Sequence, residues 1–237
     1  MYNVMDASGC EAQDMDTELL KWVSFFLAVA FIPSALWIIW LVRRAHAGPG
    51  AASIIAMFIW GAVFAVIIAV ALSILAPEFS PWRYGSSLFF MAVIVAPLAE
   101  EFAKPLGLGI VRGEIDMARD GVILGATAGL GFAATENLLY GQAALGEGGW
   151  TAFWATVVLR GIAACALHAS ATAVTGRGYG WARENMHHVA VVIPFFLLAA
   201  LMHGFYNYLA IQGTVMALAG AIAFSLLAIG LTGYSVR

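Results

Sequence analysis

An all-α bundle of about seven transmembrane helices is the fold that the sequence predicts. Of its 237 residues, 62% are hydrophobic and 11% are charged, whereas soluble domains average about 45–50% apolar and about 25% charged residues. Apolar runs close to the ~20 residues that cross a bilayer core recur along the whole chain. This composition argues against a soluble or a disordered chain. The 11 basic residues against 14 acidic ones also argue against nucleic acid as a partner.

Seven apolar runs follow one another, separated by short turns rich in glycine, proline and charge. They are approximately 19–42, 52–76, 84–111, 120–142, 150–175, 189–211 and 214–234. Residues 1–18 form an acidic tail without a basic residue, which is unlike the basic start of a cleavable signal peptide. No separator could hold a soluble domain. We therefore expect an extracytoplasmic tail over 1–18 and a single transmembrane domain over 19–237.

The positive charges predict the orientation of the bundle. When the spans alternate, seven basic residues fall on one side and only Lys21 and Arg83 on the other. The positive-inside rule makes the richer side cytoplasmic. The N-terminus is then outside and the C-terminus inside, in a multi-pass protein expected in the plasma (inner) membrane. The seven residues are Arg43, Arg44, Arg112, Arg119, Arg177, Arg183 and Arg237.

Eight polar side chains lie inside the predicted spans, within an active-site core at about 84–211. A charged side chain near the bilayer centre costs about 2.5–3.5 kcal/mol on insertion scales, so these residues are expected to face the bundle interior. Intramembrane ionisable residues are functional candidates by default. The eight are Glu100, Glu101, Lys104, Glu136, Arg160, His168, His203 and Asn207.

Spacing relates the first three of these residues to one another. Lys104 follows Glu101 by three positions and Glu100 by four, so it can pair with either carboxylate on one helix face. Pro97 and Pro105 stand on either side of the glutamates. Each proline removes a backbone donor, which predicts an irregular helix around the acidic pair.

A glycine series predicts close helix packing in the fourth span. Gly121, Gly125 and Gly129 recur every four residues, the small-xxx-small pattern of tightly packed membrane helices. The same span carries Glu136. Counted at about 1.5 Å per residue from the cytoplasmic span ends, the depths of Glu136 and His168 agree least among the candidates.

Histidines and carboxylates in one cavity allow two hydrolytic mechanisms. In the first, His168, His203 and a glutamate, assigned as Glu136, bind a divalent ion, most simply zinc, because three protein ligands and a water are the catalytic zinc pattern. In the second, no metal is needed: a Glu–His pair activates a water, while His203 and Asn207 donate hydrogen bonds to the developing oxyanion. Both mechanisms hydrolyse an amide.

The glutamates are assigned different roles in this chemistry. Glu100 is expected to be the general base, with Glu101 as its supporting partner near Lys104. Lys104, Glu136 and Arg160 are expected to support the site, Arg160 as a counter-ion.

At these positions the chain resembles the PrsW family of intramembrane proteases, distant relatives of the CAAX prenyl endopeptidases. The resemblance covers roughly residues 90–210 and includes APLAEEFAKPLGL, GLGFAATENLLY, His168 and the pair His203-x-x-x-Asn207. It implies site-one cleavage of a membrane-anchored protein, in the eponymous case an anti-sigma factor. The family is usually called a metalloprotease, although related enzymes are described as glutamate-dependent. Where the family often has an acidic residue four positions after the third-motif histidine, this chain has Thr172.

An ion-coupled transporter that uses the same buried Glu and His residues as a proton relay is the alternative function. Against it, the sequence contains no visible inverted repeat, and the expected broken helix has no counterpart in a second half.

Overall fold

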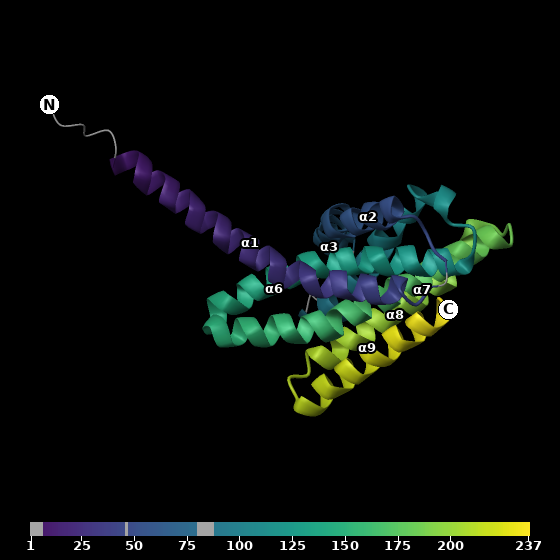
Figure 1. The fold of residues 1–237 in the computed structure, drawn as a ribbon. Helices are drawn as coiled ribbons and strands as arrows, with labels where there is room; N and C mark the ends of the chain where they lie inside the picture. The colour runs from purple at the N-terminus through teal and green to yellow at the C-terminus, as the bar shows by residue number, and fades with distance from the viewer. Residues whose placement is uncertain (1–6, 46, 80–87) are drawn as a thin grey trace.

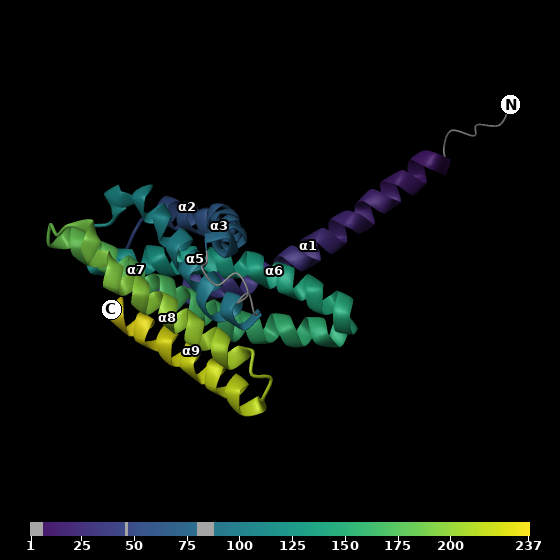
Figure 2. The same ribbon diagram turned by 180° about the vertical axis from the view of Figure 1, so that it is seen from behind.

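The computed structural model describes residues 7–45, 47–79 and 88–237, and every regular element in these segments is helical. Arg83, residues 84–87 of the third predicted span and residues 1–6 of the acidic tail lie outside the described residues. Helix α1 (Ala7–Val42) runs through the boundary predicted at residue 18. Its N-terminal part extends away from the bundle in both views (Figures 1 and 2).

Within the described residues, five helical stretches are long and apolar enough to cross a membrane, which supports a multi-pass protein. The count of seven crossings remains a prediction. The five stretches are Thr17–Val42, Ala51–Leu75, Ala118–Glu184, Val189–Ala210 and Val215–Ser235.

The longest of these stretches is a helical hairpin. It comprises α6 (Ala118–Leu159), the π-helical turn η5 (Arg160–Ala164) and α7 (Cys165–Glu184). Gly149 interrupts α6 with φ 66° and ψ −160°, a conformation that is essentially restricted to glycine. The chain reverses there, and the two limbs lie side by side in both views (Figures 1 and 2).

The predicted glycine contact joins the two limbs of this hairpin. A Cβ added to Gly121 would lie 2.0 Å from the carbonyl oxygen of Gly176, and one added to Gly129 would lie 2.2 Å from that of His168. Gly125 meets the carbonyl of Thr172 in the same way. The backbones therefore touch directly, which only glycine permits, and this contact fixes the register between the helix of Glu136 and that of His168.

Gly121→Ala should lower the thermal unfolding temperature of the detergent-solubilised protein. Alanine is normally favoured over glycine in a helix, but here its methyl group would clash with backbone, so we expect about 1–3 kcal/mol of destabilisation from overpacking. Gly230→Ala is the matched control, because a Cβ at that helical glycine meets nothing within 4 Å. Equal unfolding temperatures for the two variants would contradict the direct backbone contact.

The third predicted span is irregular, as the two prolines indicated. It consists of α4 (Leu88–Phe90), the π-helical turn η2 (Met91–Val95), α5 (Ala96–Ala103) and the 3₁₀ turn η3 (Lys104–Gly109). Pro97 lies in the first turn of α5, and Pro105 in the first turn of η3. The acidic pair thus sits on a short α-helix between two turns of different pitch.

The remaining helices surround this pair and the hairpin. The second span is built from α2 (Ala51–Ile59), the π-helical turn η1 (Trp60–Ala65) and α3 (Val66–Phe79), and it packs against α6. After the 3₁₀ turns η4 (Arg112–Glu114) and η6 (Val189–Val192) come α8 (Ile193–Ala210) and α9 (Val215–Ser235). Between η2, α5 and α8 runs an apolar groove of about 520 Å³. Gly204 of α8 approaches η2 at one point, where its Cβ would lie 2.5 Å from the carbonyl oxygen of Val93.

Candidate active site

Seven of the eight predicted polar residues form a single group, here called the polar cluster, in which five residues are buried and Glu136 and Arg160 are partly buried. Four helical elements supply it: α5 with the start of η3, α6, η5 with α7, and α8. Glu101 and Lys104 have no exposed surface, and His168 and His203 are each 2% exposed. The cluster consists of Glu100, Glu101, Lys104, Glu136, Arg160, His168 and His203.

Lys104 lies at the centre of the polar cluster. Its Nζ donates to Glu101 Oε1 at 2.8 Å, to Glu100 Oε2 at 3.1 Å and to His168 Nδ1 at 2.8 Å. Both carboxylates reach the same ammonium group although they are adjacent in sequence, because their side chains are long and Lys104 follows one turn later.

The imidazole of His168 is held in one tautomer by its partners. An ammonium group can only donate, so Nδ1 of His168 accepts from Lys104 and its proton is on Nε2. This Nε2–H donates to Glu136 Oε2 at 2.9 Å. The lone pair of His168 on Nδ1 therefore faces the Lys104 ammonium group, and Glu100 Oε2 lies 4.0 Å from the same nitrogen.

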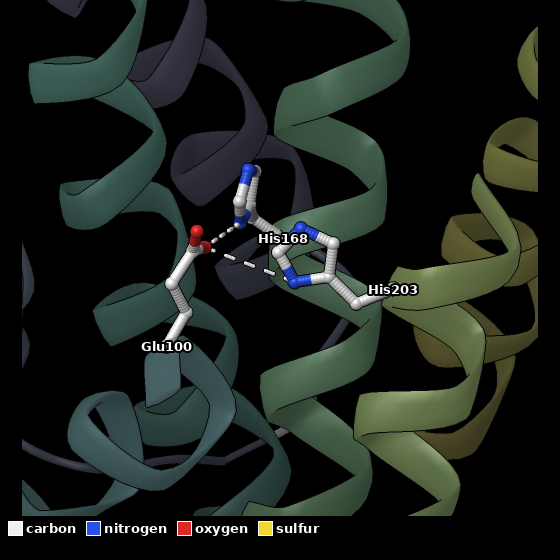
Figure 3. Close-up of side chains that lie close together, drawn as sticks. All are labelled: Glu100, His168 and His203. Atoms are coloured by element: carbon white, nitrogen blue, oxygen red, sulfur yellow. Dashed lines mark ion pairs between the residues drawn. The ribbon is translucent and has the colours of Figure 1, made fainter. Parts of the chain in front are cut away.

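In His203, Nδ1 is the donor, whereas in His168 it is the acceptor. Its Nδ1 lies 3.0 Å from Glu101 Oε1 and 3.8 Å from Glu100 Oε2. A carboxylate can only accept, so Nδ1 of His203 carries a proton and donates it to Glu101. The rings of His168 and His203 meet edge to face with centroids 4.7 Å apart. Figure 3 shows both rings turned towards Glu100.

Glu136 and His168 are in contact although their predicted depths agreed least. The reason is the length of α7, which continues to Glu184 instead of ending near residue 175, so His168 lies deeper than expected. Arg160 completes this side of the cluster: its Nη2 donates to Glu136 Oε2 at 2.8 Å, and its Nε donates to Asn137 Oδ1 at 3.0 Å. Arg160 is thus paired with Glu136, and its supporting role in the site stays a prediction.

Three further residues contact the cluster that the sequence analysis did not assign to it. Thr172 Oγ1 donates to Glu101 Oε2 at 2.9 Å, and the Lys104 ammonium lies 4.3 Å from the centre of the Phe132 ring. Asn137 holds Arg160. Thr172 and Phe132 each lie four residues from a predicted site residue, and that spacing was the available signal.

Asn207 is the predicted polar residue that lies outside the polar cluster and bonds to the backbone of η2. Its Nδ2 donates to the carbonyl oxygen of Ala92 at 2.8 Å. In the π-helical turn, the N–H of Ala96 donates to Met91, so the carbonyl of Ala92 would need a donor at Pro97, which has none. The amide of Asn207 satisfies that carbonyl, and its predicted role as an oxyanion donor stays a prediction.

A cavity of about 300 Å³ adjoins the Arg160 side of the polar cluster. Tyr140, Arg160, Tyr206 and Asn207 are among its lining residues. A water molecule takes up about 30 Å³ of liquid volume, so several could stand next to the cluster. The cavity provides space for water next to Arg160.

The donor set at the centre of the cluster fits a divalent metal ion. Glu100, His168 and His203 each offer a ligand atom within 4.8 Å of the other two. Tetrahedral zinc with bonds of 2.0–2.1 Å separates its ligand atoms by roughly 3.3 Å, so small side-chain adjustments would close the group. Each imidazole also donates an N–H to a carboxylate: His168 Nε2 to Glu136, and His203 Nδ1 to Glu101. Metal-binding histidines almost always have such a partner.

Two comparisons with known proteins find similarity to the same family. A family model described as "PrsW family intramembrane metalloprotease" matches residues 49–231, which include the whole polar cluster. "Protease PrsW" of Oceanobacillus iheyensis is 31% identical over 160 residues, 66% of this chain and 69% of the relative. No solved structure matches the chain. On the family match and on this identity, the chain belongs to the PrsW family of intramembrane metalloproteases.

Proposed function

We propose that this protein cleaves a peptide bond in or near the membrane segment of a membrane-anchored protein, with a zinc ion held by Glu100, His168 and His203. The observation that carries the proposal is the buried Glu/His/His group, with ligand atoms within 4.8 Å of one another. In each imidazole one nitrogen is engaged by a carboxylate, Glu136 or Glu101, and the lone pair of His168 on Nδ1 faces the Lys104 ammonium group. The family assignment gives the reaction class.

In this proposal the three buried glutamates have separate tasks. Glu136 orients His168 and Glu101 orients His203, so Glu100 is the carboxylate left to act on the reacting water. Zinc, when bound, would polarise the scissile carbonyl and lower the pKa of its water. A carboxylate has two oxygens, so Glu100 can bind through one and accept the proton of the water with the other. The geometry therefore favours Glu100 over Glu136, the sequence-based choice, as the metal ligand.

The substrate class is the finer part of the proposal. We propose site-one cleavage of a membrane-anchored, anti-sigma-factor-like protein in the plasma (inner) membrane. The resemblance at the four motifs supports it, as does the burial of the cluster among helices apolar enough to span a membrane. The alternative of an ion-coupled transporter gains no support from the family match.

The membrane topology is also proposed: seven crossings with the N-terminus outside. Splitting the hairpin at Gly149 and including the irregular segment of α5 adds two crossings to the five long stretches. A reporter fused after Arg237 should read cytoplasmic and one fused at the N-terminus external. If both reporters lie on the same side, the odd number of crossings is wrong.

The zinc site is tested with purified protein reconstituted in liposomes together with single-span reporter proteins of varied membrane sequence. The wild type should bind about one zinc ion per chain, measured by elemental analysis, and should release reporter fragments detectable by mass spectrometry. His203→Ala should lose both properties, whereas His187→Ala, at an exposed histidine, should keep both. Full proteolysis by a protein whose zinc content is negligible would refute the zinc site.

A further inference from the structure

Lys104 is the member of the polar cluster whose position competes with a metal ion. Its Nζ donates to His168 Nδ1 at 2.8 Å and to Glu100 Oε2 at 3.1 Å. These are the lone pair and the carboxylate that the proposed zinc ion would use. An ammonium group and a dication within a few ångströms repel each other strongly where water is excluded. Lys104 and a metal therefore cannot both hold these atoms.

Lys104 has other partners that would remain if it left His168 and Glu100. Glu101 Oε1 lies 2.8 Å from Nζ, and the ring of Phe132 lies 4.3 Å away. Neither residue belongs to the group of three ligands. An aromatic face attracts an ammonium group, so the side chain can move a short distance and still keep a carboxylate and a ring.

When no metal is bound, the buried ammonium group of Lys104 compensates the negative charge of the neighbouring carboxylates. Lys104 has no exposed surface, and fully buried lysines are rare unless they are paired. Without a cation, Glu100 and Glu101 would be adjacent carboxylates with no ammonium group between them. The lysine balances that charge and keeps the ligands assembled.

We propose that Lys104 is an internal cation that occupies the centre of the site in the metal-free protein and is displaced when the metal binds. The inference rests on the proposed zinc site. On this proposal, zinc competes with the Lys104 ammonium group for Glu100 and His168. Lys104 therefore lowers the zinc affinity of the enzyme.

The test measures zinc dissociation constants of the purified full-length protein by competition with a chelating dye. Lys104→Met removes the competing charge and should tighten zinc binding by at least about tenfold. Lys21→Met alters the chain's other lysine, which is exposed and paired with Glu18, and should leave the affinity unchanged. A purely structural lysine would give the opposite sign, because its loss would loosen the site and weaken zinc binding.

Folding is followed in the same samples, because Lys104→Met removes a buried partner of two carboxylates. We expect Lys104→Met and the second variant, Lys104→Gln, to be less stable than the wild type with a chelator present and to regain stability with zinc. Zinc should restore them because it replaces the lost cation. If neither variant folds even with zinc, displacement is wrong.

The outcomes separate this inference from the zinc site itself. If the wild type binds zinc through His203 and Lys104→Met binds it no more tightly, the internal-cation role fails and the zinc site stands. If neither the wild type nor Lys104→Met binds zinc, the zinc site fails and the inference fails with it.

Discussion

Glu100→Gln should reduce proteolysis of the single-span reporters by about 10²–10⁴-fold, the usual worth of a positioned acid–base group. The amide keeps the size of the side chain but cannot accept the proton of the reacting water. Zinc binding should also weaken, because a neutral amide is a poorer ligand than a carboxylate. The folded protein should still capture the reporter, which can be measured by co-purification.

Two further substitutions of glutamate by glutamine serve as comparisons for Glu100→Gln. Glu101→Gln should lower zinc affinity by about 10–100-fold, the cost of changing a residue that orients a ligand. Glu147→Gln, at an exposed position of the hairpin, should behave like the wild type. Normal cleavage by Glu100→Gln would remove this residue from the reacting centre and turn attention to Glu101.

Arg160→Met should destabilise the protein by about 3–5 kcal/mol, because removing one partner of a buried ion pair leaves the other uncompensated. The pair in question is Arg160 with Glu136, at 2.8 Å and with both side chains less than one-fifth exposed. Thermal unfolding in detergent measures the effect. Arg177→Met, at an exposed arginine, is the matched control and should change little.

The double variant Arg160→Met/Glu136→Leu separates stability from zinc binding. Removing both charges should recover most of the lost stability, since no unpaired charge remains. Zinc affinity should nevertheless stay about 10–100-fold below that of the wild type, because His168 has lost the carboxylate that orients it. If the double variant regains full zinc affinity, Glu136 does not position His168.

The helical class and the irregular third span could be predicted because they depend on local chemistry. Hydrophobic content requires membrane helices, and Pro97 and Pro105 lack the backbone N–H that one continuous α-helix would use at those two positions. The extent of α7 could not be predicted. Its last turns, up to Glu184, are polar enough to resemble a loop, and they are helical because Gly176 and Gly180 pack on the N-terminal end of α6.

Helical spacing identified which polar residues meet but not how they pair. The rotation of each helix decides that Glu136 backs His168 and Glu101 backs His203, and rotation depends on tertiary packing. The hydrogen-bond partner of Asn207 likewise could not be predicted from spacing. Its spacing from His203 suggested an oxyanion donor, whereas the amide is engaged by a carbonyl that Pro97, on another helix, leaves without a donor.

The glycine contacts of the hairpin make the α6–α7 side of the polar cluster stiffer than its α8 side. Between α6 and α7 the backbones touch at several successive turns, so no layer of side chains is there to deform. Helix α8, in contrast, contacts η2 at Gly204 and through the hydrogen bond from Asn207 to Ala92, and beside these contacts lies an apolar groove. The α8 side of the cluster is therefore packed mainly by side chains, which can rearrange one at a time, whereas the hairpin side is packed by backbone, which moves only with a whole helix.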